Sequence, residues 1–170
     1  MGQVIRQDLI SNKNNYSPLA IAQAFSLDRL VLYSKIHIPL LKENKIIIQD
    51  RGVTTSLVYQ PIHNPNITIE YLSKLPGNKL ALDNAPDYLF IVDVDPKEAI
   101  KRLDNRSNKQ DEAVFEKLES LEKMSDKFKS DDFKKLMEKH KTKLIYLNGN
   151  QKIDIMKQEA TQKLIQLLTK

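Results

Sequence analysis

The stretch QDRGVTTSLVYQ, residues 49–60, places an acidic and a basic side chain side by side and follows them with hydroxyl and amide groups. The Arg51 guanidinium offers a planar fork of N–H donors that matches phosphate oxygens. The Asp50 carboxylate can hold a metal ion, orient that arginine or accept a hydroxyl proton. An ordinary ion pair at the end of a strand is the alternative interpretation of this dipeptide.

A second pair of side chains indicates a site for a planar ligand. Phe25 and Arg29 are four residues apart, so a helix places them on one face. An aromatic ring beside a guanidinium can stack on a nucleobase and donate hydrogen bonds to it. Phe25 by itself is more typical of a core residue, and it is the pair that indicates a base-binding site.

The elements that must position these side chains include three short apolar runs that end in polar residues: KIIIQD (45–50), YLFIVDVD (88–95) and TKLIYLN (142–148). Runs of this kind predict three buried parallel strands. In open parallel sheets the ligand lies outside the carboxyl ends of the strands, and Asp50 and Arg51 are at one such end. The residues that follow, 54–60, are interpreted as a polar turn, and strands alternating with helices predict an α/β fold.

Helix signals complete the pattern. Ser17 as N-cap and Pro18 at the first position open a helix that can run to about residue 43, with Pro39 kinking its last turn. Asp95 as N-cap opens another helix, with a proline directly after it and a glutamate three residues on. The remaining predictions are helices over 112–140 and 151–169, and connections rich in Pro, Gly and Asn over 61–68 and 75–87.

Composition favours one globular domain, residues 1–170. The hydrophobic fraction is 41%, and no apolar run reaches the roughly 18 residues of a membrane span. Charged residues near the N-terminus interrupt any secretory signal, so the cytoplasm is the expected location. There are no cysteines, and the three histidines lack metal-ligand spacing. The net charge of +5 comes with lysines interspersed among acids, which is typical of solvated helix faces and not of a nucleic-acid-binding stripe.

At this point three segments together resemble the thymidylate kinase family: FSLDR (25–29), IIIQDR (46–51) and TTSLVYQ (54–60). In that family the matching segments build the pocket for the nucleoside monophosphate. PDYLFIVDVDPKEAIKRLDNR (86–106) resembles the family's next strand and its arginine-bearing lid, here about 102–114, and DEAVFEKLESLEKM (111–124) resembles the helix after the lid. The resemblance implies a P-loop nucleoside monophosphate kinase-like fold, with helices on both faces of a parallel sheet.

The resemblance also implies roles for single residues. Phe25 would stack on thymine, Arg29 would bond its exocyclic oxygen, and Arg51 would hold the acceptor phosphate, with Asp50 near that phosphate and the metal. The base and sugar side would be lined by Thr55, Ser56, Tyr59 and Gln60. Arg102 and Arg106 are similar to lid arginines that approach the donor phosphates, although a solvated helix face explains that pair equally well. The implied reaction moves the γ-phosphoryl of ATP to dTMP with Mg²⁺, giving ADP and dTDP for dTTP biosynthesis, in a family that commonly forms homodimers.

The sequence departs from the family's pattern in two places. Gly52 stands where an aromatic residue or histidine usually follows Asp-Arg. No G-x-x-x-x-G-K-[ST] occurs among the 170 residues, and such a loop supplies the backbone N–H groups and the lysine that cradle ATP phosphates. MGQVIRQDLIS (1–11) resembles the part of the family that follows this loop, so the first strand, the loop, the first helix and the second strand are expected to be missing.

In the family the first strand lies between the strands that match KIIIQD (45–50) and YLFIVDV (88–94). The three apolar runs are therefore predicted not to form one continuous ladder unless a partner chain or another segment fills that place. The chain by itself is expected to be inactive as a kinase. The alternatives are one half of a split kinase, completed by an N-terminal fragment, or a non-catalytic nucleotide-binding or interaction module.

Overall fold

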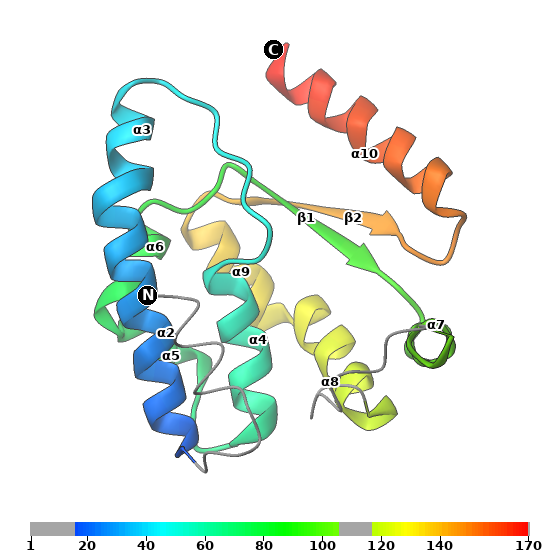
Figure 1. Ribbon diagram of the computed structural model, residues 1–170, viewed down its shortest axis with the longest axis horizontal. Coiled ribbons are helices and arrows are strands. Elements are labelled where there is room, and N and C mark those ends of the chain that lie inside the picture. Colours follow the sequence, from blue (N-terminus) through cyan, green and yellow to red (C-terminus); the bar gives the residue numbers. More distant parts are fainter. Residues whose placement is uncertain (1–15, 106–116, 170) are drawn as a thin grey trace. The chain divides into compact units, whose positions relative to one another are not determined.

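The computed structural model describes residues 16–105 and 117–169, which form a mostly helical protein with a small two-stranded parallel sheet (Figure 1). The chain divides into two compact units, Met1–Ala85 and Pro86–Lys170. Each unit is described by itself below. Most of the predicted lid, including Arg106, lies outside the described residues. That the whole chain is a single domain stays a prediction.

The first unit is built on a long helical segment that begins where the sequence predicted. It consists of α2 (Pro18–Leu32), a π-helical turn η1 (Tyr33–His37) and α3 (Ile38–Lys42), and the Ser17 side chain accepts a hydrogen bond from the Ala20 N–H at 3.2 Å. The irregularity expected at Pro39 takes the form of the π turn just before it. A proline ring crowds the carbonyl four residues earlier, and a wider turn over 33–37 relieves that crowding.

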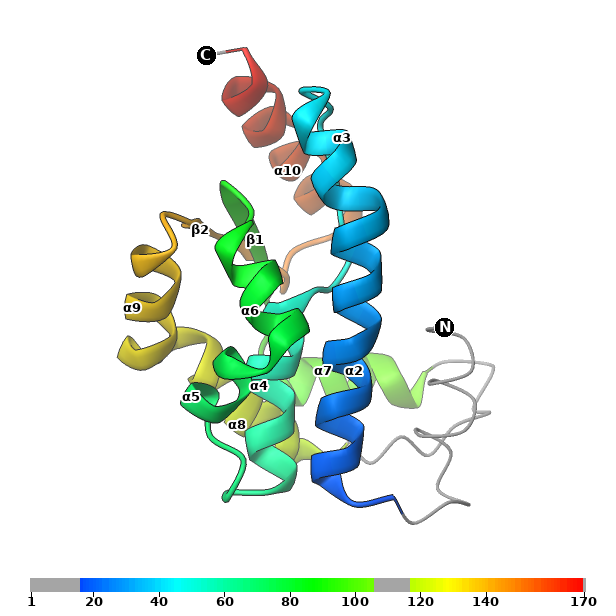
Figure 2. The ribbon, with the colours of Figure 1, turned by 90° about the vertical axis from the view of Figure 1, so that its left-hand side faces the viewer.

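Three shorter helices pack in the same unit: α4 (Val53–His63), α5 (Ile69–Lys74) and α6 (Pro76–Asp83). Figure 2 shows α4 and α6 running beside α2. Five apolar side chains form the centre of this core at 0% exposure: Ala22, Leu57, Val58, Leu72 and Ala81. Two predictions were wrong here. Residues 54–60 are not a turn but lie within α4, because Leu57 and Val58 are drawn into the core, and 75–87 is not a plain connection but contains α6.

Gly77 allows α6 to approach the backbone of α2. A Cβ on this residue would lie 2.7 Å from the Leu30 nitrogen and would collide with the Ser26 carbonyl oxygen. The Gly77 N–H instead donates to the Ser26 side-chain oxygen at 3.0 Å. The proline and glycine that made this segment look like a loop therefore start a helix and bring it against its neighbour.

The strand predicted over 45–50 is not formed. The segment has no regular secondary structure and pairs with no strand in the described part of the chain, and Ile46 and Ile48 are 67% and 78% exposed. A strand is stabilised by a neighbouring strand that satisfies its N–H and C=O groups. Residues 45–50 have no such neighbouring strand in the described part of the chain. Whether the three apolar runs form one ladder in the complete protein stays a prediction.

The second unit contains the two strands that do form, β1 (Tyr88–Asp93) and β2 (Lys143–Asn148). They pair in parallel, with Tyr88 opposite Lys143 and Asp93 opposite Asn148. The predicted strands are confirmed, but only in part as buried ones, since Ile91 and Leu147 are buried whereas Val92 is 49% exposed.

Four helices accompany these strands: α7 (Pro96–Asp104), α8 (Leu118–Lys129), α9 (Asp131–Lys139) and α10 (Ile153–Leu168). The Asp95 carboxylate accepts from the Lys97 and Glu98 N–H groups, which confirms the predicted cap of α7. Of the helix predicted over 112–140, residues 112–116 lie outside the described residues. The rest is divided at Ser130, whose hydroxyl caps α9 by accepting from the Phe133 N–H at 3.3 Å. Both α9 and α10 contact β2.

Within the described ranges, none of the helices combines the length and the apolar character needed to cross a membrane.

A buried histidine gives the first unit a pH dependence that can be measured. His37 is 8% exposed, its ring centroid lies 4.4 Å from that of Tyr33, and burial lowers its pKa below the ordinary value. The unfolded chain then binds the proton more tightly than the folded chain, so the free energy of unfolding should fall as pH drops through about 6.5. Urea unfolding at about pH 7.5 and about pH 5.5 should show this loss. His37→Gln should flatten the slope, and an unchanged slope in that variant would assign it to other groups.

Candidate functional site

Arg29 is the centre of a buried polar network in the first unit. Its side chain comes from α2 and is part of a residue only 8% exposed. Nη1 donates to the Asn78 side-chain oxygen at 2.6 Å and to the Phe25 carbonyl at 3.1 Å. Nη2 donates to the Ser56 hydroxyl oxygen and, at 3.5 Å, to the Gly52 carbonyl. We call Arg29, Asn78, Ser56 and the Gly52 carbonyl the Arg29 network; it joins α2, α4 and α6.

The Arg29 network places a cation among neutral acceptors. Desolvation lowers the pKa of Arg29 to about 10, with weaker opposing contributions from Tyr33 and Asp28. The guanidinium therefore stays protonated at neutral pH. All four acceptors named above are carbonyl, amide or hydroxyl oxygens, which stabilise the charge without cancelling it. Such a cation is suited to polarise a carbonyl oxygen of a ligand.

Two further side chains border the network. The Arg29 Cζ atom lies 6.0 Å from the centroid of the Phe25 ring, which is half-buried. Gln60 on α4 donates from Nε2 to the Ser56 hydroxyl oxygen at 3.4 Å. Its other amide atom, Oε1, is buried and has no hydrogen-bond partner among the described residues. An unpaired buried acceptor costs about 1–3 kcal/mol, so a ligand N–H that satisfied it would gain that much.

Arg51 adopts an unusual backbone conformation directly before α4. Its φ is 56°, in the left-handed region, which costs a residue with a Cβ about 1–2 kcal/mol. The Arg51 Cζ atom lies 5.9 Å from the Tyr59 ring centroid, while Arg51 and Asp50 are both exposed. The Tyr33 hydroxyl donates to the Gln49 side-chain oxygen at 3.4 Å and anchors the residue before this turn. The strained turn presents a carboxylate and a guanidinium to solvent at the N-terminus of a helix.

The first unit thus contains most of the residues predicted to bind the acceptor. Phe25, Arg29, Ser56 and Gln60 are joined by the contacts above, and Arg51 lies against Tyr59. Thr55 is half-buried one residue before Ser56, and its N–H donates to the Gly52 carbonyl at 3.2 Å. Asp50 is adjacent to Arg51 and exposed, and its role stays a prediction.

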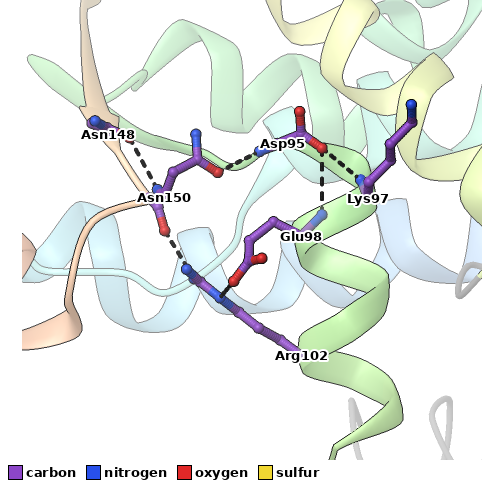
Figure 3. Close-up of polar contacts among 7 residues, drawn as sticks. Asp95, Lys97, Glu98, Arg102, Asn148 and Asn150 are labelled. Carbon is purple, nitrogen blue, oxygen red and sulfur yellow. Dashed lines mark hydrogen bonds and ion pairs between the residues drawn. The ribbon is translucent and has the colours of Figure 1, made fainter.

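Arg102, predicted as a lid arginine, lies in the second unit and is engaged there. Figure 3 shows its guanidinium between Glu98 and the turn after β2. Nε donates to the Glu98 carboxylate at 2.9 Å, and Nη1 donates to the Gly149 carbonyl at 2.8 Å. The same turn is tied to the end of β1, because the Asn150 side-chain oxygen accepts from the Asp95 N–H at 2.8 Å. In this arrangement Arg102 holds α7 to the turn; contact with donor phosphates stays a prediction, as it does for Arg106.

The carboxylates that the structure describes do not gather into a metal cluster. Among the described residues no three His, Asp or Glu side chains could jointly hold a metal ion. Mg²⁺ is usually held in kinases by one or two carboxylates and by the substrate phosphates, so a single exposed carboxylate such as Asp50 fits that chemistry.

Sequence patterns missed one residue of the network. Asn78 lies in a segment interpreted as a connection, yet it is fully buried and bonded to Arg29. No local signal marks it, because Arg29 is 49 positions away in the chain.

Known proteins show to which family this chain belongs. A family model described as thymidylate kinase matches residues 1–160. The chain belongs to the thymidylate kinase family. This membership confirms the resemblance drawn from FSLDR, IIIQDR and TTSLVYQ, and it implies the P-loop fold for the family as a whole.

Individual family members are similar along most of this chain. The thymidylate kinase of Acholeplasma laidlawii is 29% identical over 160 residues, which are 93% of this chain and 75% of that protein. The probable thymidylate kinase of Methanococcus aeolicus is 28% identical over 97% of this chain and 78% of its own length. That of Methanococcus maripaludis is 34% identical over 74% of this chain and 56% of its own length. Matches to other thymidylate kinases cover about half of the relative, as in the 49% of the Mycoplasmopsis pulmonis protein.

Proposed function

We propose that the first unit binds thymidine monophosphate as the phosphoryl acceptor of a thymidylate kinase. The observation that carries this proposal is the Arg29 network beside Phe25 and the unpaired Gln60 oxygen. Thymine presents a carbonyl oxygen at position 4 and an N–H at position 3. Arg29 supplies a donor for the first, because its Nη2 contact with the Gly52 carbonyl is long, at 3.5 Å, and a ligand oxygen can replace it. Gln60 Oε1 supplies an acceptor for the second.

The same pair of groups disfavours cytosine. Cytosine carries an amine in place of the 4-carbonyl and an unprotonated nitrogen at position 3, so both hydrogen bonds would face a group of the wrong kind. Each mismatched buried polar group costs about 1–3 kcal/mol. Guanine presents an oxygen and an N–H in a similar order, so its exclusion rests on its size against the Phe25 ring.

At the phosphate end, Arg51 is proposed to hold the acceptor phosphate. Its guanidinium is exposed and its backbone is held in a strained turn at the start of α4. Asp50 is proposed to approach the Mg²⁺ ion and the acceptor phosphate, with Thr55 and Tyr59 along the base and sugar side. The reaction of the family transfers the γ-phosphoryl of ATP to this phosphate, giving dTDP and ADP, by positioning and charge stabilisation. Arg102 and Arg106 are the proposed residues on the donor side.

Residues 1–170 contain no phosphate-loop motif, so we propose that they bind the acceptor without transferring phosphate on their own. Two alternatives follow from the same sequence. The 170 residues act as one half of a kinase that an N-terminal β-α-β fragment completes, or they form a non-catalytic nucleotide-binding or interaction module. Binding of dTMP in the acceptor site is expected for the main proposal, for the half-kinase and for a module that binds nucleotides.

Calorimetric titration of purified residues 1–170 tests the acceptor site. We expect dTMP to bind at least several-fold more tightly than dCMP, the minimum for one matched buried hydrogen bond of about 1–3 kcal/mol. dGMP should also bind more weakly than dTMP. Equal affinities for dTMP and dCMP would contradict the assignment of thymine to this site.

A phosphoryl-transfer assay separates the alternatives. With ATP, Mg²⁺ and dTMP, residues 1–170 should form no dTDP above the level of an Arg51→Ala sample, which controls for contaminating kinase. Adding a fragment that carries a β-strand and phosphate loop should restore dTDP formation if the protein is one half of a kinase. No gain in activity or in melting temperature would favour the binding module.

A further inference from the structure

Asn78 is completely buried, although it carries an amide with both a donor and an acceptor side. Burying an amide without partners costs several kcal/mol, so both of its sides should be satisfied. Its Nδ2 donates to the Leu72 carbonyl at 2.8 Å, and its Oδ1 accepts from Arg29 Nη1 at 2.6 Å. The Asn78 amide therefore makes two separate hydrogen bonds: its nitrogen donates to a carbonyl near the end of α5, and its oxygen accepts from Arg29.

The backbone around Asn78 holds this amide in place. Gly77 brings α6 against α2, and the Ser26 hydroxyl accepts from the Gly77 N–H at 3.0 Å and from the Asn78 N–H at 3.4 Å. Because the donor to Leu72 fixes which amide atom is Oδ1, the acceptor must face Arg29. The amide can rotate away from Arg29 only by giving up both hydrogen bonds.

Arg29 in turn is held on two sides. Asn78 contacts Nη1 from α6, and Ser56 contacts Nη2 from α4. A guanidinium bonded on both of its terminal nitrogens cannot rotate freely about its own axis. The plane of the fork, and hence the direction in which it can donate to a ligand, is set by these neighbours.

From this geometry we infer that Asn78 is a positioning residue that sets the orientation of the Arg29 guanidinium and so controls the choice of base. The inference rests on the proposed function, because the choice of base matters only if the site binds a nucleotide. Asn78 itself does not touch the ligand in this scheme.

Two substitutions of Asn78 separate its hydrogen bond to Arg29 from its hydrogen bond to the Leu72 carbonyl. Asn78→Asp keeps an acceptor for Arg29 but loses the donor to the Leu72 carbonyl. Asn78→Leu has a similar size and loses both. Asn84→Ala is the matched control, since the Asn84 side chain donates to the Leu80 carbonyl at the end of the same helix and is not among the hydrogen-bond partners of Arg29 described above.

Calorimetry with dTMP and dCMP gives the first readout. We expect Asn78→Leu to lower the ratio of dTMP affinity to dCMP affinity by at least roughly fivefold. This corresponds to about 1 kcal/mol, the contribution of one hydrogen bond that orients Arg29. Asn78→Asp should keep the preference of the unmodified chain to within about threefold, as should Asn84→Ala. If Asp and Leu lower the melting temperature alike and neither changes the preference, the residue is only a structural support and the inference is wrong.

A second readout needs no nucleotide and keeps the test separate from the proposed function. In the free chain, NMR should show the guanidinium protons of Arg29 exchanging with water at least roughly tenfold faster in Asn78→Leu than in Asn78→Asp. If the unmodified chain binds no dTMP, the proposed function fails while this result still supports the orienting role. Equal exchange in the two variants would overturn the inference, whatever the nucleotide data show.

Discussion

Replacing Gly77 with alanine is expected to lower the free energy of unfolding of the first unit by at least about 3 kcal/mol, at the upper end of the range for overpacked cores. The added Cβ would collide with the Ser26 carbonyl oxygen and lie 2.7 Å from the Leu30 nitrogen. Both atoms belong to the α2 backbone, which cannot move aside as the end of a flexible side chain can. Denaturant unfolding followed by circular dichroism measures the loss.

Gly52 provides the matched control. Its backbone has φ −158°, an extended conformation that any residue adopts, and the atoms nearest to a Cβ there would belong to the Gln49 side chain, at an ordinary contact distance of 3.6 Å. Gly52→Ala should therefore change the free energy of unfolding by less than about 0.5 kcal/mol. A Gly77→Ala variant as stable as Gly52→Ala would mean that α6 does not approach α2 this closely.

Replacing Arg29 with methionine is expected to weaken dTMP binding by roughly 10- to 100-fold and to abolish the preference over dCMP. Hydrogen bonds to a charged donor contribute about 1.5–3 kcal/mol, and methionine retains the length of the side chain but no donor. Calorimetry with both nucleotides measures the change. Arg29→Lys should recover only part of the affinity. An ammonium keeps the charge but lacks the planar fork that donates to Asn78 and to Ser56 at the same time.

Lys35→Met serves as the control for the loss of a positive charge, since Lys35 is exposed and lies on η1. That variant should bind dTMP as the unmodified chain does. If Arg29→Met is folded by circular dichroism and binds dTMP with undiminished affinity, then Arg29 is a buried structural cation and the base site must be sought elsewhere.

Several features of the fold could be predicted from the sequence because neighbours in the chain decide them. Ser17 and Asp95 cap their helices through hydrogen bonds that span two or three residues. Apolar runs that end in polar residues predicted β1 and β2. The four-residue spacing of Phe25 and Arg29 predicted that both lie on one helical face. The motifs around Asp50 and Arg51 were sufficient to indicate the family that the comparison confirmed.

Other features depend on partners that are distant in the chain. Residues 45–50 have the composition of a strand, yet a strand forms only beside another strand that satisfies its polar groups, and no strand pairs with these residues in the described part of the chain. Pro76 and Gly77 have the composition of a loop, yet they begin α6, because the missing side chain of Gly77 is what lets that helix pack against α2.

The sequence by itself placed Phe25 and Arg29 on one helix face and indicated the side chains that are proposed to bind a nucleotide. Only the tertiary structure decided which of them meet. Arg29 is joined to Ser56 from 27 positions away and to Asn78 from 49, and the second of these partners has no local signal at all. The physical reason is that a buried guanidinium must find acceptors wherever the packing of the helices brings them, whereas caps and helix faces are set within a few residues of chain.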